Sequence, residues 1–523
     1  MNDDSPSPAP RSFAEALQGQ FQQAERRRRE GADFILALDQ GTTSSRAIVF
    51  DRAGRIAGRG QEEVTPLFPS PGHVEQDPNQ LWLTTLASAR KAIDATGASA
   101  REIAAIGLTN QRETTILWDR ATGVPVAPAV VWQSRITAPE CARLKAEGHE
   151  PLVREKTGLV LDPYFSATKI SWILDQSPAL RQRAERGELC FGTVDSFLLW
   201  RLTSGRVHAT DVTNASRTLL WNLREGTWDD ELLSLFRVPR ALLPEVKPSS
   251  GLFGVTDRKW FGEELPITGI AGDQQAATFG QQCFAPGLVK NTYGTGCFAV
   301  MNTGDSIVDS KFGLLGTAAW RIGDETTFAL EGAIFVAGAV IQWLRDGLGI
   351  ISQASESETL ASRVKDNGGV YLVPAFVGLG APYWDPDARG AIYGLTRGAT
   401  REHLCRAALE SIVLQTRDVV EAMSCDSGLA IPALRVDGGA TANDLLMQLQ
   451  ADVLGIPVHR PQILETTALG AAYLAGLASG FWPDVASLAN QWHLDRVFEP
   501  RMSVDQRDSW YAEWKKAVAR TRS

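Results

Sequence analysis

The sequence lacks the features that would assign it to several protein classes. Its six cysteines are scattered without a Cys-x-x-Cys pair, so neither a zinc site nor a disulfide framework is indicated, and a reducing cytoplasm is the expected location. The net charge is -9, so the chain lacks the basic excess that would hold nucleic acid by counterion release. Nucleic acid is therefore not an expected partner.

Long apolar runs are also missing. The longest, residues 332–341 and 468–478, are shorter than the roughly 18 residues that suggest a bilayer-spanning helix, so we expect no membrane span.

Residues 1–32 are rich in Pro, Ser, Gln and Arg but have no signal-peptide apolar region. We expect them to form a disordered or helical N-terminal extension. Its arginine run at 26–29 could touch an anionic surface, although a solvated segment is favoured because nearby acids dilute the charge.

The commonest phosphate-binding loop is excluded as well. No G-x-x-x-x-G-K-[ST] string occurs, and the chain contains no Gly-Lys dipeptide. Any nucleotide must be held by another device.

What remains is an ordinary globular composition, with 44% hydrophobic and 22% charged residues. The length of 523 residues suggests two to four domains. Short apolar and β-branched runs at 34–38, 103–108 and 267–270 alternate with helical patterns, which is typical of an α/β fold. A softer region at 246–265, rich in Pro, Ser and Gly, leads toward a domain boundary expected near 280–287.

The C-terminal segment has the signature of an amphipathic helix. Ser503 and Gln506 stand in capping-box register, and Trp510, Trp514 and Val518 follow at i, i+4 and i+8. We expect this helix to dock on the second half of the chain.

Two segments echo one another. Residues 35–50 and 288–301 both read as strand, polar turn, strand, with turns at 39–45 and 293–296. Such turns expose backbone N–H groups and hydroxyls that can cradle phosphate oxygens, so a facing pair would grip a polyphosphate. Asp39 closes the first strand, where a carboxylate can hold Mg²⁺ through water or simply cap its own turn.

Two glycine-containing segments could approach a nucleotide closely. The string RVDGGA at 435–440 precedes Asn443 and a helical pattern; it could cover the adenosine end or serve only as a connector. A helix is expected over 333–345, with Gly338 and Gln342 one turn apart. An interior glycine there implies close packing against another helix or a ligand.

Other residues fit acid-base and polyol chemistry. Asp273 follows a strand and opens a helix, so it is either a helix cap or a general base for a substrate hydroxyl. Arg112 and Glu113 lie on a loop, either as a solvated pair or as the donor and acceptor that vicinal hydroxyls require. The aromatic residues Trp132, Tyr164 and Phe298 could wall such a pocket or belong to the core.

Taken together, long strings in one order resemble the FGGY carbohydrate kinases. The resemblance covers about residues 34–481. The strings that carry it are ALDQGTTSSR (37–46), NQRETT (110–115), YFSATKISWI (164–173), GIAGDQQ (269–275), NTYGTGCF (291–298) and GAIYGL (390–395), the last followed by His403-Leu404 and by Ala407-Ala408-Leu409-Glu410.

The resemblance implies a duplicated actin-like, ribonuclease-H-like α/β fold with two domains around a cleft. We expect residues 1–32 to be the extension, 33–283 the N-terminal domain and 284–523 the C-terminal domain. It also implies ATP-dependent phosphorylation of a small polyol, with glycerol as the expected substrate, Mg²⁺ as cofactor, and a homodimer or homotetramer as the assembly. The alternatives are phosphorylation of another polyol or ketose, such as a tetritol or pentulose, or a nucleotide-gated binding protein on the same fold.

Site residues follow from the resemblance position by position. The nucleotide would meet Thr42, Thr43, Ser44, Arg46, Thr295, Gly338, Gln342, Gly439 and Asn443. The substrate pocket would contain Arg112, Glu113, Trp132, Tyr164, Asp273, Gln274 and Phe298. Asp273 would be the general base, and Asp39, through water, and Asp273 would hold the metal.

Overall fold

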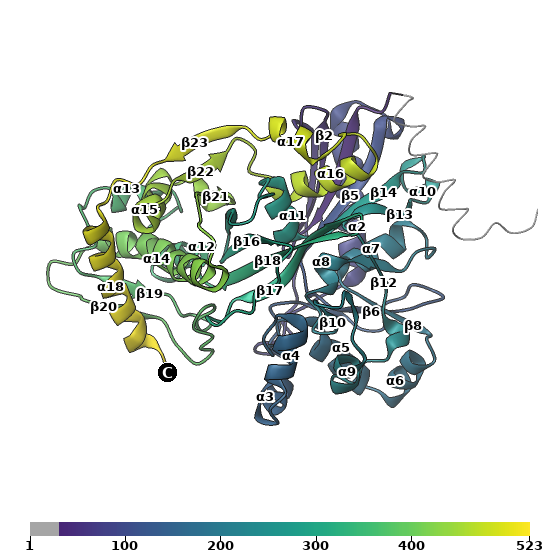
Figure 1. The fold of residues 1–523 in the computed structure, drawn as a ribbon, viewed down its shortest axis with the longest axis horizontal. Coiled ribbons are helices and arrows are strands. Elements are labelled where there is room, and N and C mark those ends of the chain that lie inside the picture. The colour runs from purple at the N-terminus through teal and green to yellow at the C-terminus, as the bar shows by residue number, and fades with distance from the viewer. Residues whose placement is uncertain (1–30) are drawn as a thin grey trace, which may run out of the picture.

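One large mixed sheet runs through the molecule. The structure is a computed structural model that describes residues 31–523 (Figure 1), so the predicted extension lies outside the described residues except for its last two positions. The sheet has 13 strands. In spatial order they are β23 (Leu494–Phe498), β22 (Val458–Pro461), β21 (Leu434–Asp437), β15 (Val289–Tyr293), β16 (Cys297–Gly304), β18 (Glu325–Ile334), β17 (Leu315–Ile322), β13 (Ser250–Val255), β14 (Pro266–Gly272), β5 (Ile103–Asn110), β1 (Phe34–Gln40), β2 (Ser44–Asp51) and β3 (Ile56–Glu63).

The sheet contains the same arrangement twice. In the N-terminal half, β1 pairs antiparallel with β2 and parallel with β5, and β5 pairs parallel with β14. In the C-terminal half, β15 pairs antiparallel with β16 and parallel with β21, and β21 pairs parallel with β22. The halves meet where β13 lies beside β17, in a register of one residue pair, Ser250 with Ile322. The predicted duplication is therefore present in the strand order.

Helices pack against this sheet and against one another. They include α2 (Pro78–Thr96), α7 (Val194–Leu202), α11 (Asp273–Gly280), α14 (Arg401–Ser427), α15 (Asp444–Leu454), α16 (Thr466–Ala478) and α18 (Val504–Thr521). A helical region of the N-terminal half contains α3 (Ala138–Ala146), α4 (Glu150–Thr157), α5 (Ser166–Asp175), α6 (Pro178–Glu185), α8 (Val212–Ala215) and α9 (Asp230–Leu235). The remaining short helices are α10 (Arg258–Phe261), α12 (Gly338–Gln342), α13 (Glu356–Ala361) and α17 (Val485–Leu488).

Short strand pairs lie outside the large sheet. They are β4 (Glu75–Gln76) with β7 (Ala129–Val130), β6 (Ile116–Asp119) with β8 (Leu189–Gly192), β9 (Ala209–Asp211) with β12 (Glu245–Lys247), β10 (Trp221–Asn222) with β11 (Thr227–Trp228), and β19 (Tyr371–Val373) with β20 (Ala391–Tyr393).

Helix α16 comes late in the chain but packs on the N-terminal half. It lies against α11, β1, β5 and β14, and its yellow ribbon sits among the purple strands in Figure 1. A Cβ on Gly107 of β5 would lie 2.1 Å from the carbonyl oxygen of Ala471 in α16, so only glycine permits this approach. The domain boundary predicted near 280–287 stays a prediction.

The C-terminal helix is confirmed. Ser503 caps α18, and its side chain and that of Gln506 bond each other's backbone N–H reciprocally. From its buried face, Tyr511 and Trp514 donate hydrogen bonds of 2.6 and 2.9 Å to the carboxylate of Asp418 in α14. The packing of α18 on α14 buries Asp418, and burial raises the pKa of this carboxyl to about 6.

One prediction of local structure is wrong. Residues 325–334 continue as strand β18, and helix α12 begins only at Gly338, so the helix expected over 333–345 starts five residues late. The soft region at 246–265 contains strand β13, with Gly251 and Gly254, and helix α10, which Gly262 caps at its C-terminus. As predicted, a strand and a helix, β14 and α11, follow it. No helix within residues 31–523 has the length and apolar character to cross a membrane.

Candidate active site

The first predicted hairpin forms, but with a shorter turn. Strand β1 ends at Gln40 and β2 begins at Ser44, so only residues 41–43 connect them, not the predicted 39–45. The N–H of Gly41 donates to the carbonyl of Ser44 at 2.9 Å. Asp39 stays in the ladder, paired with Arg46. Thr42 and Thr43 therefore stand at the tip, with Ser44 and Arg46 just behind it.

The second hairpin has the same form. Residues 294–296 connect β15 to β16, and the N–H of Gly294 donates to the carbonyl of Gly296 at 2.9 Å. Thr295 is exposed at the tip, while its carbonyl accepts hydrogen bonds from Ala337 and Ala339 at 2.8 and 3.1 Å. Each half thus presents a three-residue polar turn whose threonine side chains remain accessible.

Both glycine segments converge on this second hairpin. Gly338 opens α12, and its N–H donates to the carbonyl of Gly294 at 3.0 Å; a Cβ there would lie 2.6 Å from that oxygen. Gly438 has φ +90°, and a Cβ on it would lie 2.4 Å from the carbonyl of Tyr293. Gly338, predicted to pack inside a helix, instead lies at the start of α12 and allows it to approach the turn at 294–296.

The other nucleotide candidates lie on the segments that begin at these glycines. Gln342 is exposed at the end of α12, and a Cβ on Gly439 would meet no atom within 4 Å. The Asn443 side chain caps α15 by accepting from the N–H of Leu446 at 2.8 Å. The structure therefore gathers Thr295, Gly338 and Gly439 around one turn, and it also gives Asn443 a capping bond.

The acidic and polyol candidates share one edge of the sheet. Strands β1, β5 and β14 are parallel neighbours, and their last residues lie side by side, Gln40 with Asn110 and Asn110 with Gly272. Side chains that follow these ends gather at the carboxyl edge, where α/β sheets bind ligands. Asp39, the Arg112–Glu113 pair and Asp273 are brought together in this way.

Asp273 is the first residue of α11, and Gly272 takes the cap position. Its carboxylate lies 3.1 Å from Nε of Arg112, and its side chain is 30% exposed whereas that of Arg112 is 1% exposed. The carboxylate of Asp273 is therefore partly open to solvent, while the guanidinium that pairs with it is buried.

Asp39 is buried beside a second acid. Burial raises its pKa to about 6; the positive charge of Arg46 opposes the rise, and the charges of Asp273 and Glu465 add to it. No residue within 31–523 donates a hydrogen bond to this carboxylate, and Arg46 instead donates to Glu465 at 2.8 Å. Two nearby carboxylates, one without a donor, fit a hydrated divalent cation, which would relieve their repulsion.

The aromatic wall is assembled from both halves. The ring of Trp132 lies 5.7 Å from that of Tyr164 and 6.3 Å from that of Phe298 in β16. The indole N–H of Trp132 donates to the hydroxyl of Thr42 at 2.9 Å, which connects these aromatic residues to the first hairpin. Gln274 is buried, and Lys290 donates both to its side chain and to the carbonyl of Phe298.

Sequence reasoning missed three buried charges near this pocket: Arg217, Lys290 and Glu331. Each is 0% exposed. Glu331 is the single charged residue in the apolar run 328–341, and an isolated charge in such a run indicates a buried group that must be paired. That signal was available, although the identity of the partners was not.

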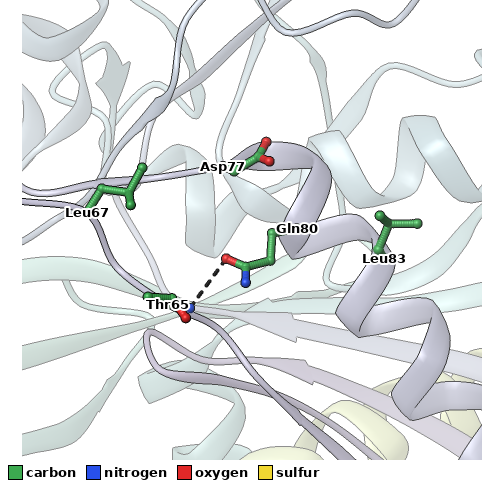
Figure 2. Close-up of a pocket in the computed structure, with 5 residues that line it drawn as sticks. All are labelled: Thr65, Leu67, Asp77, Gln80 and Leu83. Carbon is green, nitrogen blue, oxygen red and sulfur yellow. Dashed lines mark hydrogen bonds between the residues drawn. The ribbon is translucent and has the colours of Figure 1, made fainter.

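A separate surface hollow contains none of the predicted site residues. It has a volume of about 470 Å³ and is lined by Thr65, Leu67, Asp77, Gln80 and Leu83. Figure 2 shows the bond that crosses it, from the N–H of Thr65 to the side-chain oxygen of Gln80 at 3.3 Å. Its lining offers one carboxylate, Asp77, which already caps α2, so the hollow has no chemistry in common with the site.

Comparison with known proteins places the chain in a family. The N-terminal domain of the FGGY family of carbohydrate kinases matches residues 34–280, and its C-terminal domain matches residues 289–479. The chain belongs to the FGGY family of carbohydrate kinases, and the predicted actin-like α/β fold is confirmed.

Relatives narrow the similarity further. The chain is 59% identical to "Glycerol kinase 2" of Thermotoga maritima, over 93% of this chain and 98% of the relative, and 60% identical to "Glycerol kinase" of Pseudothermotoga lettingae over the same shares. The structure of Plasmodium falciparum glycerol kinase with ADP superposes with a TM-score of 0.88 at 35% identity, covering 94% of this chain and 98% of that one. A xylulose kinase from Lactobacillus acidophilus, at 21% identity and a TM-score of 0.82 over 94% and 99% of the two chains, shares the fold.

Proposed function

We propose that this chain transfers the γ-phosphoryl group of ATP to a terminal hydroxyl of glycerol, giving ADP and sn-glycerol 3-phosphate. The carrying observation is the sheet edge where Asp39, Asp273 and the Arg112–Glu113 pair meet. Relatives near 60% identity are named for this activity, which favours glycerol over a tetritol or pentulose.

The nucleotide is proposed to lie between the two hairpins. Thr42, Thr43, Ser44 and Arg46 would contact its phosphates from one side and Thr295 from the other. Its remaining contacts would come from Gly338, Gln342, Gly439 and Asn443. For Arg46 to reach a phosphate, its hydrogen bond with Glu465 must be exchanged for a phosphate oxygen.

Mg²⁺ is the proposed cofactor. Asp39, through water, and Asp273 would hold it, and when bound it would neutralise charge on the phosphate oxygens. The coupling of the two acids in the pKa of Asp39 supports this assignment.

Asp273 is proposed as the general base. Its partial exposure lets it face a substrate hydroxyl, and the ion pair with Arg112, 3.1 Å from Nε to one carboxylate oxygen, holds it in place. The hydroxyl proton moves to the carboxylate as the substrate oxygen bonds to phosphorus and the bond to ADP breaks. Glu113, Gln274 and the rings of Trp132, Tyr164 and Phe298 would hold the three-carbon chain and exclude water that would otherwise accept the phosphoryl group.

The test measures ADP release across a polyol panel. We expect release with glycerol to exceed that with tetritols and pentuloses; a faster rate with a pentulose would contradict the proposal. Cytoplasmic location and a homodimer or homotetramer stay predictions.

Substitution of the base is the sharper test. Asp273→Asn should lower turnover by about 10² to 10⁴, the usual contribution of a general base, with ATP affinity largely intact. Turnover near that of the unsubstituted protein would leave Asp273 as a helix residue only.

A further inference from the structure

Four buried charges form a ring behind the proposed polyol pocket, and two of them have no role in the mechanism above. Arg112 and Glu113 follow β5, Arg217 follows α8, and Glu331 lies in β18 of the other half. Each side chain is at most 1% exposed. Two guanidinium groups and two carboxylates alternate around the ring, so their charges balance.

Three sides of the ring are closed by short contacts. Glu331 accepts from both terminal nitrogens of Arg112, at 2.5 and 3.0 Å, and from Nη2 of Arg217 at 2.9 Å. Nε of Arg217 donates to Oε1 of Glu113 at 2.7 Å. The fourth side, from Nε of Arg112 to Oε1 of Glu113, measures 3.9 Å, which is too long for a hydrogen bond.

The open side has a physical cause. Arg112 and Glu113 are adjacent in sequence, and a buried guanidinium and carboxylate with no other partners would pair directly. Glu331 occupies both terminal nitrogens of Arg112, and the carboxylate of Asp273 lies 3.1 Å from its Nε. Arg217 occupies one oxygen of Glu113, so each member of the pair faces another counter-ion. Glu113 also adopts φ +59°, a left-handed backbone uncommon for non-glycine residues and frequent at ligand sites.

Arg217 is fixed by more than its two ion pairs. Its guanidinium lies 5.7 Å from the ring centre of Tyr164 and 5.3 Å from that of Phe165, within the range of cation–π attraction. Its Nη1 is buried and finds no hydrogen-bond partner within residues 31–523. The guanidinium of Arg217 therefore packs against Tyr164, a proposed pocket residue, and its Nη1 is a donor without a partner among the described residues.

We propose that Glu331 and Arg217 are positioning residues that hold Arg112 and Glu113 apart, so that two vicinal hydroxyls of the substrate bridge the open side of the ring. One hydroxyl accepts from the guanidinium and its neighbour donates to the carboxylate. This inference rests on the proposed function, because it takes glycerol as the ligand.

The test compares glycerol with 1,3-propanediol, which lacks vicinal hydroxyls. In Glu331→Gln, Arg112 loses the charge of the counter-ion that holds both its terminal nitrogens and can shift toward Glu113. We therefore expect the KM for glycerol to rise by about tenfold or more, in line with coupling in buried charge networks. The kcat/KM for 1,3-propanediol and the KM for ATP should stay unchanged. The matched control is Glu325→Gln, an exposed acid at the start of the same strand, which should alter none of these values.

The outcomes separate the two proposals. An unchanged glycerol KM in Glu331→Gln, or equal losses with both alcohols, would overturn the positioning role while the unsubstituted protein still phosphorylates glycerol. If that protein releases no ADP with glycerol, the proposed function fails, and the inference with it. Should Glu331→Gln not fold, Glu331→Asp keeps the charge on a shorter side chain and should show the same selective loss for glycerol, in smaller measure.

Discussion

At the scale of single residues, the proposed site at the carboxyl edge of β1, β5 and β14 contains a buried acid, Asp39, whose charged form is destabilised by burial. Asp39 is buried next to Asp273, and its pKa stands at about 6 instead of the ordinary 3.8. Below that pH the carboxyl is protonated, and a proton then competes with the cation it is proposed to hold. We expect the KM for Mg-ATP to rise as the pH falls through about 6 and to level off above it, as steady-state kinetics from pH 5 to 8 would show.

A matched pair of variants checks this assignment. Asp39→Asn should remove the rise together with most of the Mg²⁺ dependence. Asp51→Asn alters the acid at the far end of strand β2, which bonds the backbone of residues 53 and 55, and should keep the rise. A pH profile in Asp39→Asn identical to that of the unsubstituted protein would assign the effect to another group.

Sequence reasoning identified residue types better than their partners. Asp273, Arg112 and Glu113 are recognisable because they follow strands in polar strings, and parallel strands bring such positions together. Glu331 and Arg217 were missed because their partners are distant in sequence. Glu331 lies 219 residues from Arg112 and 114 from Arg217, and Arg217 lies 104 residues from Glu113. No local pattern reports contacts of that separation.

At the scale of elements, the second hairpin depends on glycine contacts. In Gly338→Ala the new Cβ would lie 2.6 Å from the carbonyl of Gly294, so α12 or the turn must shift, at about 1–3 kcal/mol for such overpacking. We expect the KM for ATP to rise several-fold while the KM for glycerol stays near its original value, because Gly338 is not among the proposed polyol contacts.

Gly398→Ala is the control for that substitution. This glycine is exposed, and a Cβ on it would make only an ordinary contact at 3.7 Å with Thr396. It should leave both KM values unchanged. Equal changes in the two glycine variants would indicate a general loss of stability instead of a displaced turn.

Helix α18 is held by hydrogen bonds to a buried acid. Trp514→Phe removes the donor 2.9 Å from Asp418 but keeps most of the apolar contact. At pH 8, where Asp418 is ionised, we expect a loss of about 1.5–3 kcal/mol in the free energy of unfolding, the usual value for a hydrogen bond to a charged group. Denaturant titration measures it, and an unchanged midpoint would contradict it.

Periodicity predicted some elements and misplaced others. The capping box and spaced aromatics of α18 are local signals, and the helix formed where they indicated. Apart from Glu331, the run at 328–341 is apolar or glycine, and such a run suits a buried strand as well as a buried helix. The boundary at Gly338 depends on contact with Gly294, which is a tertiary feature.

At the scale of the whole molecule, the proposed substrate pocket belongs to both halves. Phe298 of β16 contacts Trp132, and Glu331 of β18 pairs with Arg112 at the end of β5. Glycerol at 100 times its Kd should therefore stabilise the protein by about 2.7 kcal/mol, and both halves should respond together. Calorimetry with and without glycerol checks this, and a shift confined to one of two separate transitions would contradict it.

The late position of α16 affects how the chain folds during synthesis. The ribosome releases strands β1, β5 and β14 before it makes residues 466–478, which cover them. At translation rates of about 5–20 residues per second, that interval of some 190 residues lasts roughly 10–40 s. During this time the nascent N-terminal half exposes an apolar sheet face with no cover, and that half is where chaperone binding and premature aggregation would concentrate.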